Sequence, residues 1–129
     1  MAILANIVNE VKDGIVATIR GTNEITAEAT KLVRDTVVNS LRASGDIATT
    51  TVQVATDVAQ GVILGASTTG VSLVSAARTG VKAIVQGVSD VGGDVVEATG
   101  NAVKGAIKQT ADVGGDVAQV AVGAVQGAI

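Results

Sequence analysis

Apolar residues recur at helical spacing through the first 43 residues of the chain. In residues 2–20 they follow the i, i+3, i+4, i+7 rule, which places them on one side of a helix. A break at residues 21–23 offers an N-cap, and residues 24–43 repeat the pattern with acidic residues early and basic residues late, an order that complements the helix dipole. We therefore predict two amphipathic helices in residues 1–43. Their apolar faces are expected to include Ile3, Ile7, Val11, Ile15, Leu32 and Leu41.

Residues 44–89 are poorer in charge and richer in Gly, Thr and Val. The segment opens with Gly45 and with Asp46 as a candidate N-cap. Its acidic residues lie early and its basic residues late, which again favours a helix. The pattern allows one long helix, roughly 65 Å at about 1.5 Å per residue, or a hairpin broken around residues 65–70.

Residues 90–129 contain two similar units. Residues 90–107 (DVGGDVVEATGNAVKGAI) and 112–129 (DVGGDVAQVAVGAVQGAI) are offset by 22 residues and agree at 11 of 18 positions. Weaker echoes occur 44 residues earlier, at twice this period. Because 22 is two elevens, and an 11-residue repeat corresponds to about 3.67 residues per turn, we predict helical repeats that keep one face aligned while running nearly straight.

Each unit carries the motif VGGDV, at residues 91–95 and 113–117. Calcium-binding repeats with paired glycines need a further glycine and more oxygen ligands than this motif supplies. The favoured interpretation is a helix stop and restart, in which Gly ends one helix and Asp caps the next. The alternative is a continuous helix whose glycines allow a neighbouring helix to approach closely.

Small residues recur four positions apart in the second half of the chain. On a helix this spacing produces a smooth stripe on which another backbone can pack closely. We predict a helix-packing interface formed by Gly61, Gly65, Ala98, Ala102, Ala106, Gly123 and Gly127.

The composition leaves few groups for catalysis or metal binding. The chain has no His, Cys or Tyr, so Ser-His and Cys-His arrangements are impossible. Residues 100–107 (GNAVKGAI) look like a P-loop but lack the Lys and Ser or Thr that follow the second glycine of that motif. We predict no enzymatic activity, no cofactor, no metal site and no small-molecule substrate.

The same composition bears on the partners. Of the 61 hydrophobic residues, 24 are Val and 21 are Ala, and there is no aromatic side chain. A lone domain built this way would be marginally stable, so that copies of itself or a lipid surface would supply the missing burial. Nucleic acid is not expected as a partner, because the sequence shows neither a basic patch nor aromatic residues. The uncharged run 58–77 is just long enough to span a bilayer, but its Ser, Thr and Gln residues favour a buried helix.

In composition, residues 46–129, with VGGDVVEATGNAVKGAI as an example, resemble the amphipathic-helix repeat proteins: synucleins, exchangeable apolipoproteins, late-embryogenesis-abundant proteins and, more loosely, phasins of storage granules. The resemblance implies helices that pack together or lie on a surface, and it transfers no functional residue. The chain departs from synuclein-like repeats because residues 46–129 hold only four basic residues. Its mean hydropathy of +0.51 also sets it apart from desiccation-protective proteins, which are far more hydrophilic.

We therefore predict an all-α protein of aromatic-free amphipathic helices, extended or packed as hairpins, that assembles through helix–helix contacts. A β-solenoid is the alternative, because Val and Thr favour strands. The predicted function is that of a non-enzymatic structural protein that self-assembles into a filament, tube or sheet. The alternative is an amphipathic coat on a membrane, lipid or storage-granule surface. The expected partners are copies of the chain or such a surface, and the expected location is the cytoplasm, at a membrane or granule surface in the second case.

Overall fold

The computed structural model describes residues 2–19, 27–45 and 47–128. Within these ranges the chain forms helices and no strand, which confirms the all-α class; the β-solenoid alternative is wrong. The predicted N-caps at residues 21–23 and 46, and the side chain of Ile3, lie outside what the structure describes. The helices of the described part are α1 (Ala2–Thr18), α2 (Ala27–Ser44), α3 (Ile47–Thr69), α4 (Leu73–Asp90), α5 (Val95–Asp112) and α6 (Val117–Ala128).

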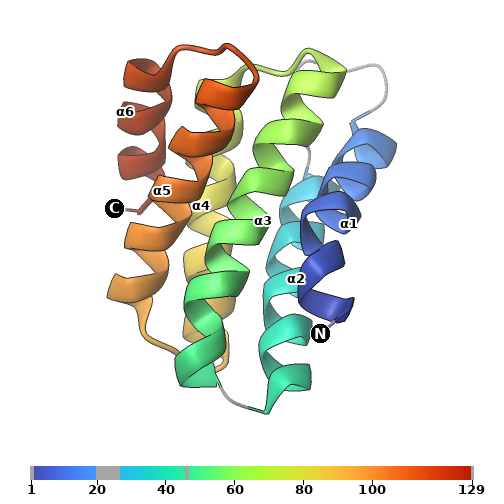
Figure 1. Ribbon diagram of the computed structural model, residues 1–129, viewed down its shortest axis with the longest axis vertical. Coiled ribbons are helices and arrows are strands. Elements are labelled where there is room, and N and C mark those ends of the chain that lie inside the picture. The colour runs from blue at the N-terminus through green and yellow to red at the C-terminus, as the bar shows by residue number, and fades with distance from the viewer. Residues whose placement is uncertain (1, 20–26, 46, 129) are drawn as a thin grey trace.

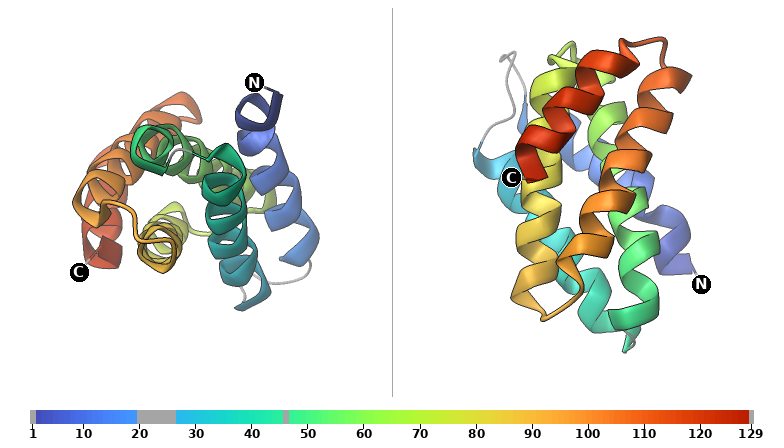
Figure 2. Two further views of the ribbon diagram at one scale, coloured as in Figure 1. Left: turned by 90° about the horizontal axis from the view of Figure 1, so that it is seen from below. Right: turned by 90° about the vertical axis from the view of Figure 1, so that its left-hand side faces the viewer.

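The helices form two layers of parallel helices. Helices α1, α3 and α5 lie side by side in one layer, and α2, α4 and α6 lie in the other (Figures 1 and 2). Because successive helices run in opposite directions, the helices within one layer are parallel. The chain is therefore a stack of three helical hairpins, with α1/α2 at one end and α5/α6 at the other. This arrangement resembles that of solenoid proteins, in which each repeat packs on its neighbours.

Both VGGDV motifs are turns between helices. Gly92 and Gly114 have φ of 76°, a left-handed conformation that ends α4 and α5. The carboxylates of Asp94 and Asp116 then accept hydrogen bonds of 3.1 Å from backbone N–H groups in the first turns of α5 and α6. The stop-and-restart interpretation is thus confirmed.

The 22-residue repeat is one helix plus one four-residue turn. α5 and the turn before it span residues 91–112, and α6 begins after an equivalent turn. Because consecutive helices are antiparallel, equivalent surroundings recur only every second helix, after 44 residues. The two units are therefore separate helices joined by a turn, and no single aligned face continues from one unit to the next.

Residues 47–90 form a hairpin rather than one long helix. Gly70, with φ of 81°, follows the end of α3, and the hydroxyl of Ser72 accepts a hydrogen bond of 3.4 Å from the N–H of Ser75 in the first turn of α4. The observed break lies at the end of the region in which the sequence allowed one.

The core lies between the two layers, and its side chains become smaller along the stack. α1 to α4 bury the larger aliphatic groups, among them Ile7, Val11, Ile15 and Leu41 of the predicted apolar faces. Leu32 is half-buried and packs over Gly14. By contrast, α5 buries only small residues: Ala98, Ala102, Gly105, Ala106 and Thr110. The last hairpin therefore gains the least apolar burial.

Candidate functional site

The predicted packing residues of α3 face α1 within the same chain. A Cβ placed on Gly61 would lie 2.7 Å from the carbonyl oxygen of Val8, and one on Gly65 would lie 2.7 Å from Cβ of Ile15. These two glycines are buried, so the stripe they form is already occupied by α1.

The other predicted packing residues are also used inside the molecule. A Cβ on Gly123 would lie 2.7 Å from the carbonyl oxygen of Val74 in α4, and one on Gly127 would overlap the carbonyl of Arg78. Ala98, Ala102 and Ala106 form the buried side of α5. In the structure these residues lie at contacts between helices of one chain.

Two glycines that the sequence analysis missed, Gly87 and Gly105, belong to the same set. A Cβ on Gly105 would lie 2.6 Å from the carbonyl oxygen of Thr56, so α5 approaches α3 as closely as α3 approaches α1. Gly105 follows Gly61 by 44 residues, and the 44-residue echo in the sequence could have identified it.

The three hairpins stack by one recurring contact, in which a glycine of the later helix lies against a backbone carbonyl of the earlier one. Between the first and second hairpins the partners are 53 residues apart: Gly61 and Val8, Gly65 and Lys12, Gly87 and Arg34. Between the second and third they are 49 residues apart: Gly105 and Thr56, Gly123 and Val74, Gly127 and Arg78. The sequence separation of the contacting residues is the same in both layers at each junction, which indicates that the two helices of a hairpin dock together. The two steps differ by four residues, about one helical turn.

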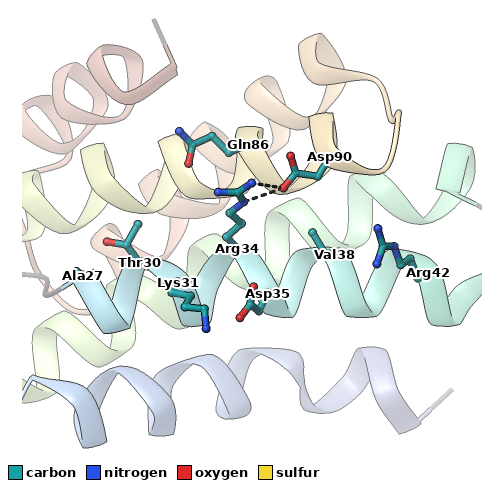
Figure 3. A pocket seen from close by; sticks show the side chains of 9 residues that line it. All are labelled: Ala27, Thr30, Lys31, Arg34, Asp35, Val38, Arg42, Gln86 and Asp90. Carbon is teal, nitrogen blue, oxygen red and sulfur yellow. Dashed lines mark hydrogen bonds and ion pairs between the residues drawn. The ribbon is translucent and has the colours of Figure 1, made fainter.

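A polar groove lies along the layer of even-numbered helices. Figure 3 shows its larger hollow, between α2 and α4. The two hollows of the groove, about 680 and 420 Å³, share Thr30 and Gln86 in their linings and therefore lie next to each other. Arg34 reaches from α2 to Asp90 at the end of α4, and its Nε and Nη2 both lie 2.7 Å from Oδ2 of Asp90. This hydrogen bond, together with the aspartate charge, raises the pKa of Arg34. The ion pair spans the groove and leaves both side chains substantially exposed.

The groove is basic although the chain is acidic. It holds five basic and two acidic residues, a local charge of +3, against a net charge of −3 for the whole chain. The sequence analysis did not identify this cluster, because its basic residues come from two segments, residues 31–42 and 78–82, which only the packing of α2 against α4 brings together. The prediction of no nucleic-acid partner now rests on the missing aromatic residues alone. The charged residues are Lys31, Arg34, Asp35, Arg42, Arg78, Lys82 and Asp90.

A second surface of interest is apolar and lies on the last hairpin. Val96 is 83% exposed, Val122 58%, Val125 49% and Val95 38%. Among the described residues only one further large apolar side chain is exposed, Val52 of α3. The exposed valines therefore mark the α5/α6 end of the stack.

Asp57 is the buried carboxylate of the described part. It lies in α3, is 8% exposed, and accepts hydrogen bonds of 3.0 and 2.9 Å from Nε2 of Gln53. Burial raises its pKa, and the hydrogen bond from Gln53 opposes this shift. The position 44 residues later holds Asn101, whose side chain carries no charge.

Within the described ranges, no group of three or more acidic residues could hold a metal ion, and no helix is long and apolar enough to cross a membrane. The candidate sites are therefore the two surfaces, the basic groove and the apolar end. Comparison with known proteins found no matching family model, no matching curated protein and no matching solved structure.

Proposed function

We propose that this protein is a non-enzymatic structural protein that assembles with copies of itself. The observation that supports the proposal is the exposed apolar end of the helical stack, where Val96, Val122 and Val125 are each about half exposed or more. Fully burying a valine side chain gains about 1.5–3 kcal/mol over leaving it in water. An apolar surface of this kind is typical of a contact with another molecule.

The proposal changes the residues that the sequence suggested for assembly. The small-residue stripes and the apolar faces of α1 and α2 are buried inside one chain. Assembly therefore depends on the outer side of the last hairpin, and the small residues act by bringing the hairpins of one chain together.

The test is the mass of the purified protein in solution, measured by sedimentation velocity over a hundredfold range of concentration and followed by negative-stain electron microscopy. We expect the mass to rise with concentration, with regular particles or polymers in the images. A protein that stays monomeric at the highest concentration would refute the proposal.

A second candidate function is a coat on an anionic surface, and the basic groove is the observation that favours it. Each Lys or Arg close to an anionic lipid surface contributes about 1 kcal/mol of attraction. The groove presents three such residues from α2 and two from α4. Five of the nine basic residues of the chain line this groove, which concentrates positive charge on one layer.

Sedimentation with vesicles tests this candidate. The double substitution Arg78→Glu and Lys82→Glu changes the groove, while Lys104→Glu and Lys108→Glu makes the same change of charge on exposed positions of α5. A coat that binds through the groove should lose binding to phosphatidylglycerol vesicles only with the first pair. Equal loss with both pairs would indicate net charge alone, and no binding by the unmodified protein would exclude the coat.

A further inference from the structure

We infer that one end of the basic groove is a binding site for the phosphate group of a soluble small molecule. The site is the smaller hollow, of about 420 Å³, and each of the three hairpins contributes one helix to its lining. Such a site is independent of the proposed self-assembly, and it lies in the groove on which the alternative coat function rests. Its polar lining residues are Thr30 of α2, Arg78, Thr79, Lys82 and Gln86 of α4, and Gln126 of α6.

The smaller hollow carries positive charge without a carboxylate. Within the part of the chain that the structure describes, its lining holds Arg78 and Lys82 and no acidic residue. The larger hollow instead sets two aspartates against its three basic residues, and its Asp90 already holds Arg34 through two contacts of 2.7 Å. An added anion would therefore meet unneutralised charge at the end of the groove formed by Arg78 and Lys82.

The two basic side chains of α4 repel each other and have no partner in their own helix. Arg78 and Lys82 are four residues apart and both exposed, so they are neighbours on one face of the helix, where like charges are destabilising. The one carboxylate of α4 belongs to Asp90, which pairs with Arg34. Among the described residues neither Arg78 nor Lys82 takes part in an ion pair. A bound anion would relieve this repulsion.

The groups that line the hollow suit a phosphate. An Arg guanidinium presents a planar pair of N–H donors that fits two phosphate oxygens, and a Lys ammonium adds a compact charge. The amides of Gln86 and Gln126 and the hydroxyl of Thr79 can donate further hydrogen bonds. In Figure 3 the amide of Gln86 points away from Asp90. A phosphate group carries a charge of about −1.5 to −2 at neutral pH, which matches the two cations of the lining.

Close backbone contacts fix the helices around the hollow. A Cβ on Gly127 of α6 would overlap the carbonyl of Arg78, and a Cβ on Gly87 of α4 would lie 3.1 Å from the carbonyl oxygen of Arg34 in α2. The hollow therefore exists only when the three hairpins are packed, and a ligand bound there stabilises the folded state by mass action. Its volume of about 420 Å³ lies within the range of small-molecule sites, about 300–1,000 Å³, so the phosphate can belong to a larger molecule.

Titration calorimetry and thermal melting test the site, with inorganic phosphate and pyrophosphate as probes and sodium chloride at matched ionic strength as the control. At 100 times the dissociation constant of pyrophosphate, we expect the melting temperature to rise by at least about 5 °C. The double substitution Arg78→Gln and Lys82→Gln should weaken binding at least about tenfold. Lys104→Gln and Lys108→Gln remove the same charge, at the same spacing, from exposed positions of α5 and should leave binding unchanged. Arg78→Lys keeps the charge but loses the planar pair of donors, and it should also weaken binding.

Equal weakening by both double substitutions would show attraction by net charge alone and would overturn the site. A melting temperature that rises no more with pyrophosphate than with chloride would do the same. If Arg78→Gln and Lys82→Gln lower stability without any probe but leave pyrophosphate binding intact, the two residues serve the fold and the inference is wrong. Binding to phosphatidylglycerol vesicles without binding of pyrophosphate would exclude the soluble ligand and leave the coat function standing. Binding of pyrophosphate without binding of vesicles would support the site and exclude the coat.

Discussion

The close approach of α5 to α3 can be tested with a matched pair of alanine substitutions in one helix. Gly105→Ala places a methyl group 2.6 Å from the carbonyl oxygen of Thr56, 0.8 Å short of the 3.4 Å at which ordinary contact begins. The next nearest atom, Cα of Thr56 at 3.2 Å, also belongs to the backbone, so no side chain can rotate away. Gly100→Ala adds the same methyl group to an exposed position in the same helix, where it meets no atom of a neighbouring element.

Both substitutions remove a glycine from a helix interior, which stabilises a helix by about 1 kcal/mol. Their difference therefore isolates the cost of forcing the two backbones apart. Overpacking of this kind costs about 1–3 kcal/mol, and the upper part of this range is expected because both partners are main chain. Gly100→Ala should be more stable than the unmodified protein by about 1 kcal/mol, and Gly105→Ala less stable by up to about 2 kcal/mol.

Urea denaturation followed by circular dichroism at 222 nm measures both values. The protein should be dilute, so that self-association does not add to the stability of the folded state. If the two variants prove equally stable, α5 does not pack on α3 through Gly105, and the glycine-on-carbonyl stacking would be wrong at this step.

Three further predictions concern charged groups. Because burial raises the pKa of Asp57 in the folded state, the contribution of this group to the free energy of unfolding is full below the ordinary aspartate pKa and is lost as the pH rises through the raised value. Asp57→Asn should thus raise the free energy of unfolding at neutral pH, on the order of 1 kcal/mol, and the gain should vanish in urea titrations near about pH 3. Asp94→Ala removes the N-cap of α5 and should cost about 0.5–2 kcal/mol, whereas Asp112→Ala, at the exposed end of α5, should change thermal stability by less than about 0.5 kcal/mol. Asp90→Asn breaks the ion pair with Arg34, and because both side chains are substantially exposed, the loss of stability on denaturation should be small and should shrink further in high salt.

Much of the secondary structure followed from local signals in the sequence. The spacing of Ile7, Val11 and Ile15 identified the buried face of α1, because apolar side chains at helical spacing have few other ways to leave water. The paired glycines and the aspartate of each VGGDV motif identified two turns, because the left-handed glycine and the capping carboxylate act within a few residues of one another.

The tertiary structure decided which helices these small residues would join. A stripe of glycines shows that a close neighbour exists, but the neighbour of Gly105 is a carbonyl 49 residues earlier, and no local pattern identifies it. The basic groove arose for the same reason, since its residues come from two helices that only packing brings together. The exposure of Val96 was also decided by packing, because nothing in the local pattern separates it from the buried valines of α3 and α4. Local chemistry determined the helices and turns of this protein, and contacts between distant parts of the chain determined which of its surfaces remain open.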